Sequence, residues 1–312
     1  MALNNLRVVY NNLVDLSTTA TLTASSAQAA TPASNLAKDA KGAVWRSSPT
    51  TISGTTVTAY LLLDMGSAQS IHCVALPFTN LTSAATINVT GYSAAPSLTG
   101  TVDAPIVTGG TVVTNFTQTT TACQWNTLGL SAWGTNPLAA NTYAYGGGTY
   151  ATVWLNATIR AISTARYVLI KITDTRAAAT GLYIEASRLV IGQYWTPKYN
   201  TGYGMTSGIK DLSTHERTES GDLVTQRGPR SSVLGFDLQW LDPSDRVIMT
   251  KILLGNGMPK PLFISLFPEN GSTAAQLEME RSHQIYGKLM TVPGLTYSNL
   301  DIYNTRFDLE EV

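Results

Sequence analysis

Cysteine and histidine are both scarce in this sequence. Cys73 and Cys123 are the only two cysteines in 312 residues, and the three histidines are His72, His215 and His283. A chain of this length buries enough apolar surface to fold without cross-links, so two free thiols are expected, with one disulfide as the open alternative. None of the histidines shares a metal-ligand spacing with another histidine or a cysteine. We therefore expect no metal ion and no cofactor.

Charge is also scarce. Charged residues make up 13% of the chain, about half of the usual share, and 20 basic residues balance 20 acidic ones. Proteins that bind nucleic acid normally carry a basic excess, so we expect no nucleic-acid partner. Thr, Ser, Ala, Asn and Gly take the place of the missing charge, which is typical of β-rich proteins that contact other molecules over much of their surface.

Long apolar runs are missing as well. The N-terminal sequence MALNNLRVVYNNLVDLS has neither the basic start nor the apolar segment of a secretory signal. No stretch approaches the ~20 apolar residues that a membrane-spanning helix needs. We expect no signal peptide and no membrane contact, although hydrophobic residues reach 44% and suffice for a packed core.

Signatures of catalysis are not found in the sequence. It contains no Gly-x-Ser-x-Gly elbow, no phosphate-binding loop and no dinucleotide fingerprint. His72 and Cys73 are consecutive in a predicted strand, which places them on opposite faces and argues against a nucleophile–base pair. Acidic pairs near the C-terminus, such as Glu278 and Glu280, favour a solvated surface over the paired carboxylates of a glycosidase. The sequence predicts a protein that is not an enzyme.

Short runs with alternating apolar and polar residues fill the first two-thirds of the chain. β-branched and aromatic residues at period two, with turns at close intervals, favour an antiparallel sandwich or barrel. Between these runs, the stretch 97–149 is a long Gly- and Thr-rich insert, in which IVTGGTVV at 106–113 predicts a hairpin. The predicted strands lie at 60–65, 71–77, 85–92, 150–159, 166–173 and 182–195.

Composition changes at 197–212, which is rich in Gly, Thr and Pro and is predicted to be a linker. Beyond it, 213–312 is predicted to be an α+β domain. Residues 222–227 and 233–241 predict a hairpin around Gly228-Pro229. Along the second of these strands, the residues predicted to share one face are Phe236, Leu238 and Trp240.

One helix is predicted at about 243–254. Asp242 is suited to be its N-cap, Pro243 to the first position and Asp245 to the first turn, and Gly255 and Gly257 can end it. The apolar stripe predicted to face the core consists of Val247, Ile248, Ile252 and Leu253. Strands are predicted after the helix at 261–267, 283–290 and 301–309.

Residues 1–196 contain motifs that resemble the discoidin-like (galactose-binding-like) jelly-roll family. The runs ARYVLIKITD and LYIEASRLVIG also resemble the last strands of that fold. The resemblance implies a mainly β, N-terminal jelly roll whose loops at one end bind ligands. The motifs that carry it are, in order, Asn35 and Asp39, Trp45, Asp64-Met65-Gly66, and Ile71, Val74 and Leu76.

The sequence departs from this family at the aspartate loop. Many members hold a structural calcium there and have a threonine two residues before the tryptophan, where this chain has Ala43 and a shorter spacing. We therefore expect no calcium ion. Trp45 is interpreted as a core residue rather than a ligand platform. Arg46 is expected to pair with Asp39 or Asp64, or to face a partner.

The segment RTESGDLVTQRGPRSSVLGFDLQWLDPSDRVIMTKILLGNGMPKPLFISLFPEN, followed by QIYGKL, resembles tail-tip or baseplate proteins of tailed phages. Distal tail proteins of this class join a ring-forming β domain with one helix to a peripheral sandwich, here in reversed order. The resemblance implies a structural protein of the virion tail tip. It further implies a homohexameric ring that contacts the tail tube, the tape-measure protein and other baseplate proteins.

Charged side chains in the C-terminal domain are candidates for the interface between ring subunits, because a cyclic assembly needs complementary patches on different faces. A merely solvated surface is the alternative. The candidate interface residues are Arg217, Glu219, Arg227, Arg230, Glu278 and Arg281.

Aromatic residues in the 97–149 insert suggest a second function, the recognition of host surface glycans, since aromatic rings stack on sugar faces. The alternative is that these residues pack the insert onto the sandwich. The candidate carbohydrate-binding residues are Trp125, Trp133, Tyr143 and Tyr145.

Overall fold

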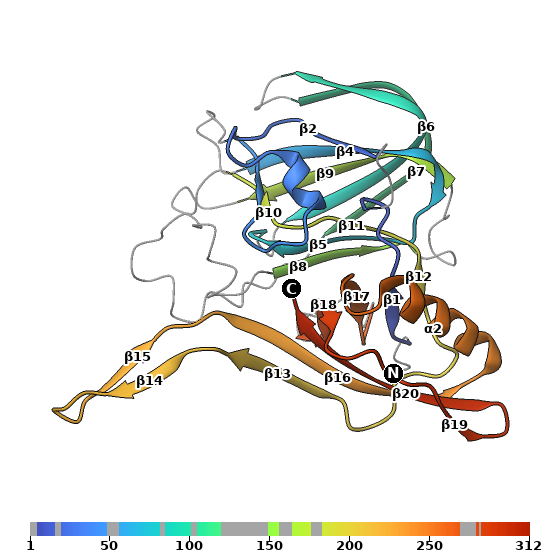
Figure 1. The fold of residues 1–312 in the computed structure, drawn as a ribbon. Helices are drawn as coiled ribbons and strands as arrows, with labels where there is room; N and C mark the ends of the chain where they lie inside the picture. Colours follow the sequence, from blue (N-terminus) through green and yellow to red (C-terminus); the bar gives the residue numbers. More distant parts are fainter. Residues whose placement is uncertain are drawn as a thin grey trace.

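The computed structural model shows a mainly β protein with two sheet-containing parts that lie against each other (Figure 1). The predicted mainly β fold class is therefore confirmed. No helix among the described residues is long and apolar enough to cross a membrane. The residues that the structure describes are 5–15, 20–48, 56–81, 85–100, 105–119, 149–155, 164–175, 183–268, 279–280 and 282–312.

The N-terminal part is a sandwich of two antiparallel sheets. One sheet has the order β2-β4-β9-β6-β7, formed by Thr21–Ala24, Thr56–Ser70, Thr164–Thr175, Thr86–Gly100 and Pro105–Thr119. The other has the order β11-β5-β10-β3 with β8 beside β5, formed by Val190–Gly192, Cys73–Thr79, Glu185–Ala186, Trp45–Arg46 and Thr149–Trp154. A short 3₁₀ helix, η1, covers Ala33–Ala37.

Burial along β4 follows the period of two expected for a sheet with one covered face. Val57, Ala59, Leu61 and Leu63 are buried in the core between the two sheets, whereas the residues that alternate with them are partly exposed. Fully burying a valine or leucine side chain contributes roughly 1.5–3 kcal/mol. The alternation in the sequence thus specifies which face of the strand points inward.

Trp45 is fully buried in this core, and its Nε1 donates to the Ser26 carbonyl at 3.1 Å. The interpretation of Trp45 as a core residue is confirmed. Arg46 pairs with neither predicted aspartate, because its Nε lies 2.6 Å from Glu185 on the neighbouring strand.

The C-terminal part is built on one antiparallel sheet with the order β12-β1-β17-β18-β20-β16-β13, with β19 beside β20. In that order the strands are Tyr194–Trp195, Arg7–Val9, Leu262–Ser265, Gln284–Leu289, Ile302–Glu311, Arg230–Leu241 and Thr206–Asp211, and β19 is Thr296–Asn299. The helix α2, Pro243–Asn256, packs on the face of the sheet that carries Leu238 and Ile264. Strand pairing therefore divides the chain differently from the predicted boundaries. β1 belongs to the C-terminal sheet, and the predicted linker contains β13.

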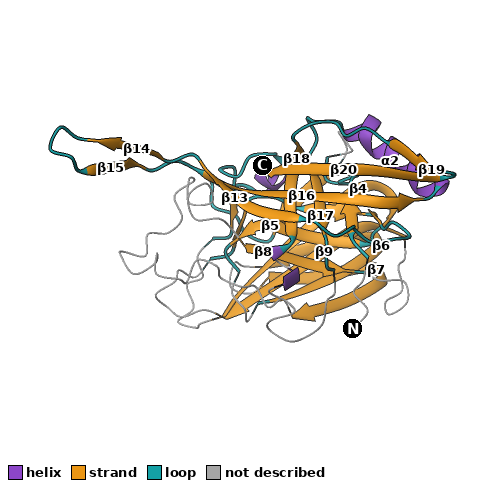
Figure 2. Ribbon diagram, turned by 90° about the horizontal axis from the view of Figure 1, so that it is seen from below, coloured by secondary structure: helices purple, strands orange, loops and turns teal. Residues whose placement is uncertain are grey.

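Two strands, β14 (Thr214–Arg217) and β15 (Leu223–Gln226), pair with each other and form a separate two-stranded sheet. They extend β13 and β16 into an arm, residues 206–231, that projects from the body (Figures 1 and 2). The hairpin predicted between 222–227 and 233–241 is therefore wrong, since β16 pairs with β13 and β20. Gly228 lies so close to the Leu212 backbone that a Cβ there would come within 2.3 Å of it, which accounts for the glycine.

The hairpin predicted at 106–113 is also wrong. β7 runs through this stretch as one strand along β6, with register shifts near Tyr92. Gly109 and Gly110 have φ of +69° and +78°, yet Gly109 pairs with Pro96 in the regular register, so the two glycines lie inside a continuous strand rather than in a turn. A Cβ on Gly110 would lie 2.7 Å from the Tyr92 ring.

Helix α2 begins as predicted, because the Asp242 side chain accepts from the Asp245 amide at 2.9 Å. The predicted inward stripe is partly wrong. Of its four residues Ile252 is buried, but Val247 is 53% exposed. Trp240, predicted to face the core with Phe236, has φ of +66° at a register shift and is 57% exposed.

Candidate functional site

The joint between the sandwich and the C-terminal sheet is an apolar and aromatic layer. Strand β5 is buried along its whole length, because one of its faces packs in the sandwich core and the other in this joint. The same arrangement holds for the C-terminal sheet, where Phe263 faces the joint and Leu262 and Ile264 face α2. The joint residues are Val9, Val44, Cys73, Ala75, Phe78, Trp154, Val190, Phe263 and Tyr286.

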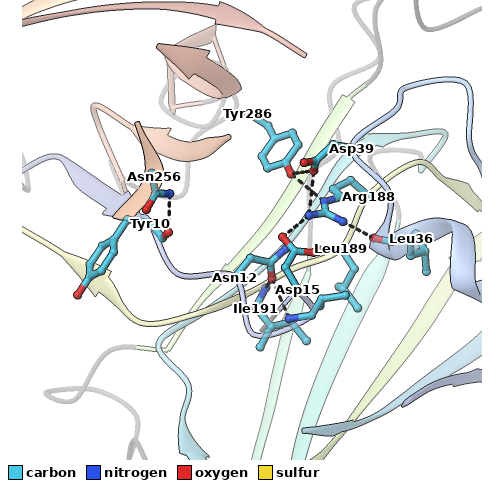
Figure 3. A network of polar contacts seen from close by, with 11 residues as sticks. Tyr10, Asn12, Asp15, Leu36, Asp39, Arg188, Leu189, Ile191, Asn256 and Tyr286 are labelled. Atoms are coloured by element: carbon cyan, nitrogen blue, oxygen red, sulfur yellow. Dashed lines mark hydrogen bonds and ion pairs between the residues drawn. The ribbon is translucent and has the colours of Figure 1, made fainter. Parts of the chain in front are cut away.

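A buried polar network lies at one edge of the joint (Figure 3). The Arg188 guanidinium, 1% exposed, donates to the Tyr286 hydroxyl at 2.8 Å and pairs with Asp39 at 2.9 Å and with Asp15. The Tyr286 hydroxyl in turn donates to Asp39 at 2.7 Å. Burial raises the pKa of Tyr286 well above its usual range, so the phenol stays protonated and serves as a donor.

Two asparagines hold the segment that runs from the C-terminal sheet into the sandwich. The Asn12 side chain donates to the Leu189 carbonyl and accepts from the Ile191 amide, both at 3.0 Å. Asn256, the last residue of α2, donates to the Tyr10 carbonyl at 2.7 Å (Figure 3). These bonds tie α2 and the sandwich to the same short stretch of chain.

Two glutamates also bond across the joint. Glu311 accepts from Tyr150 at 2.6 Å and from Lys41 at 2.9 Å. Glu280, 8% exposed, accepts from the Trp154 indole at 2.8 Å. The predicted solvated surface is therefore wrong for Glu280, and Glu278 lies outside the described residues. Because these carboxylates are engaged as acceptors between the two parts, they serve to hold the parts together.

The side chains with reactive chemistry are placed for packing. Cys73 is a free, fully buried thiol, and burial raises its pKa far above the usual range, so it is not a thiolate nucleophile. Burial lowers the pKa of His72, whose ring packs edge-on against Tyr194. In the described part of the chain no three metal-binding side chains come together. Cys123 lies outside that part.

The arm is the most exposed part of the described chain. Every residue of β13, β14 and β15 is exposed. Its large apolar residues are Ile209, Leu212, Leu223 and Val224, which are 72%, 54%, 57% and 54% exposed. Among the described residues, β14 and β15 pair only with each other, and an isolated two-stranded hairpin is only marginally stable in water.

Four of the predicted interface residues lie on the arm. Arg217 donates to the Gly221 carbonyl at 2.9 Å across the hairpin turn, and Glu219 is exposed in that turn. Arg227 follows β15, and Arg230 pairs with Asp211 at 2.7 Å near the body. The structure thus brings these residues onto one element, whereas Glu278 and Arg281 lie outside the described residues. Their role as an interface stays a prediction.

Two shallow hollows lined by polar residues lie on the described surface. One, of about 280 Å³, lies on the outer face of β6 and β9 and is lined by Thr86, Asn88, Lys171 and Thr173. The other, of about 560 Å³, lies between the 291–296 segment and the outer face of β16 and β20. The predicted carbohydrate-binding aromatics, Trp125, Trp133, Tyr143 and Tyr145, lie outside the described residues.

No family model matches the chain, and no curated protein matches it. Among solved structures, chitosan-binding module 1 of a chitosanase/glucanase from Paenibacillus sp. IK-5 is 16% identical, with a TM-score of 0.35 over 59% of this chain and 99% of the module. The family 32 carbohydrate-binding module of NanJ from C. perfringens, solved with galactose, is 14% identical, with a TM-score of 0.30 over 56% of this chain and 93% of the module.

A GH29 fucosidase from Ruminococcus gnavus is 12% identical, with a TM-score of 0.35 over 59% of this chain and 27% of the fucosidase. These likenesses concern the fold, and at this level they carry no argument about function. The description of the sandwich as two antiparallel sheets rests on the strand pairing of this structure and not on these likenesses. The tail-tip resemblance has no counterpart among the structures named here and stays a prediction.

Proposed function

We propose that this chain is a non-enzymatic assembly protein that binds other protein subunits through the arm of its C-terminal part. The observation that carries the proposal is the arm itself, which leaves the body and exposes four large apolar side chains. Fully burying one such side chain contributes roughly 1.5–3 kcal/mol. A partner that covers the arm therefore gains affinity and stabilises the hairpin at the same time.

The polar and aromatic joint supports this proposal, because it fixes the sandwich to the C-terminal part. A subunit that docks through the arm then carries the sandwich in one defined orientation. The buried Arg188–Tyr286–Asp39 network and the Trp154–Glu280 bond both join the two parts. Such a division of labour suits a structural component that displays one module while it assembles through another.

Within this class we propose a component of a tailed-phage tail tip. The copies would form a homohexameric ring that links the tail tube to tape-measure and peripheral baseplate proteins. The support is the resemblance of the 217–289 segment to such proteins. The sandwich would lie at the periphery of the ring, and the protein would be located in the virion.

The test is the oligomeric state of the purified chain, measured by light scattering and by negative-stain micrographs over a range of concentrations. We expect closed rings, and we expect that deletion of residues 214–226 leaves a folded protein that stays monomeric. Circular dichroism checks that the deletion variant folds. A parent chain that remains monomeric at high concentration overturns the proposal.

A second candidate function is glycan binding by the sandwich. The observation that favours it is the hollow lined by Thr86, Asn88, Lys171 and Thr173, whose hydroxyl, amide and ammonium groups match the hydrogen-bonding groups of sugars. The predicted aromatic residues of the insert are the other candidate site. The two functions are compatible, because a displayed sandwich is free to contact a host surface.

Calorimetry with galactose and chitotriose as probes tests this second function and locates the site. Loss of binding in Asn88→Ala and Lys171→Ala places it in the hollow. Loss in Trp125→Ala and Trp133→Ala places it in the insert instead. The function is removed if the parent chain gives no heat with either probe and does not bind to a glycan array.

A further inference from the structure

Helix α2 carries apolar side chains on its outward face as well as its inward face. Val247 and Leu254 are 53% and 83% exposed, and with Lys251 between them they follow the spacing of a single helical stripe. Met258, 48% exposed, lies just beyond the end of the helix, after its C-cap Gly257. The inward face, by contrast, includes the polar Asp245, which accepts from the Trp195 indole at 3.3 Å and from the Lys198 amide at 3.0 Å. The outward stripe is therefore more apolar than the surface of a helix that faces only water.

The exposed charges beside this stripe are all basic. Between residues 243 and 260 they are Arg246, Lys251 and Lys260, and the acidic residue of this segment, Asp245, is buried. Lys251 lies within the stripe, one turn from Val247 and one turn from Leu254. A partner that covers the stripe is thus expected to combine apolar side chains with negative charge.

The tip of the arm, residues 212–226, has this combination. It exposes Leu223 and Val224, and its charged residues are three acids and one base, with Glu219 at the turn. The net charge of the tip is therefore −2 with His215 neutral, opposite in sign to the outward face of α2.

The arm of one chain does not cover the α2 of the same chain. Strand β16 has 12 residues and joins the arm at Arg230 to the start of α2 after Leu241, which separates them by about 40 Å at the usual rise of a strand. The arm points away from α2 (Figures 1 and 2). Only the arm of another molecule can reach the stripe.

We propose that the arm tip of one copy docks on the outward stripe of α2 in a second copy, so that subunits join head to tail. This inference rests on the proposed assembly function and names its acceptor surface. Contact between two different surfaces at opposite ends of one domain is heterologous, and such contacts close into rings when the rotation between subunits permits. The chemistry of the contact is Val224 against Leu254 and Val247, with Glu219 near Lys251. Leu223 precedes Val224 in β15 and therefore points to the other face of the hairpin.

A charge exchange tests this pairing. Glu219 and Lys251 are both exposed, so reversing either charge leaves the fold intact. We expect Glu219→Lys and Lys251→Glu each to weaken self-association about 3- to 10-fold, because each change replaces an attraction between two exposed charges by a repulsion. The double variant restores the parent dissociation constant to within about twofold, because the two charges are exchanged across one contact. Sedimentation velocity over a concentration series provides these constants.

Apolar and cross-linking variants test the same contact independently. Leu254→Ser is expected to weaken self-association at least about tenfold, since the side chain moves from water into the interface. Ile106→Ser, a matched control on β7 of the sandwich that is 52% exposed in the parent, is expected to have no effect. In a Cys123→Ser background, mixing Leu254→Cys protein with Val224→Cys protein is expected to give a disulfide between the two variants.

Each outcome decides one of the two proposals. Restored association in the double variant, or a mixed 224–254 disulfide, supports the docking of the arm on α2. Rings that form but ignore Lys251→Glu and Leu254→Ser, or disulfides between two copies of the same variant, overturn the docking and leave the assembly function standing. A parent chain that never self-associates overturns both.

Discussion

The sandwich and the C-terminal part differ sharply in how much apolar surface they leave exposed. Among the described residues, the large apolar side chains exposed on the sandwich are Ile106, Val112 and Val113, all on β7, whereas fifteen more lie between Tyr199 and Leu300. The sandwich covers its apolar faces with its own two sheets. The C-terminal part has one sheet, with the sandwich and α2 on opposite faces, and an arm that neither covers. This difference supports the proposal that the C-terminal part binds other subunits.

The largest effect expected from this comparison concerns two tryptophans. Trp45→Ala removes a fully buried side chain from the sandwich core and is expected to lower the free energy of unfolding by about 3–5 kcal/mol. Trp240→Ala, at an exposed position of the C-terminal part, is expected to change it by less than about 1 kcal/mol. Urea denaturation of both variants measures the difference. Equal losses would contradict the assignment of Trp240 to the surface.

The second prediction concerns the joint. Arg188→Ala leaves Asp15, Asp39 and the Tyr286 hydroxyl without their buried partner. Because both aspartates are partly exposed and regain water, we expect a loss of about 2–3 kcal/mol rather than the full cost of breaking a buried pair. The loss of these contacts is expected to loosen the packing of the sandwich on the C-terminal sheet. Hydrogen exchange is expected to show this as faster exchange of the backbone amides of β18. Unchanged exchange there would show that the apolar layer alone holds the joint.

The smallest effect lies at the base of the arm. Hydrogen bonds from Ser213, followed by those from Arg230, lower the pKa of Asp211 to about 2. Since this folded pKa lies below the unfolded one, the stabilisation is present above the unfolded value of 3.8 and is lost as the pH falls through about 2. Carboxyl titration by NMR is expected to show a larger upward shift in Ser213→Ala than in Arg230→Gln. The reverse order would make the ion pair the main cause.

Features set by neighbouring residues were predictable from the sequence. The Asp242 cap, the alternation along β4 and the burial of Trp45 each follow from local chemistry, and the structure has all three. At 106–113 the predicted hairpin is wrong, because two adjacent glycines with positive φ suggest a turn but are also accommodated inside a strand. Only the pairing of β7 along the whole of β6 decides between these outcomes.

Features set by distant parts of the chain were not predictable in this way. Leu223 and Val224 have the pattern of an ordinary strand, and nothing in their sequence says that the strand leaves the body. The apolar positions of α2 lie on both sides of the helix, so the pattern alone did not show that Val247 faces outward. The joint was missed because Glu280 and Arg188 find their partners, Trp154 and Asp39, more than a hundred residues away. A useful signal for the arm is the polar run TSGIKD, which has too few apolar residues to cover a core.

The place of β1 has a consequence for how the protein is made. Arg7–Val9 lies between β12 and β17, where Val8 pairs with Ile264. A ribosome therefore completes the whole sandwich before β17, one of the two partners of β1, has been synthesised. Pairings over such a span form slowly, and an edge that waits for its neighbour is open to wrong partners in the meantime. We expect the C-terminal sheet to form only after translation of β17, so the sandwich folds before the surface that we propose for assembly exists.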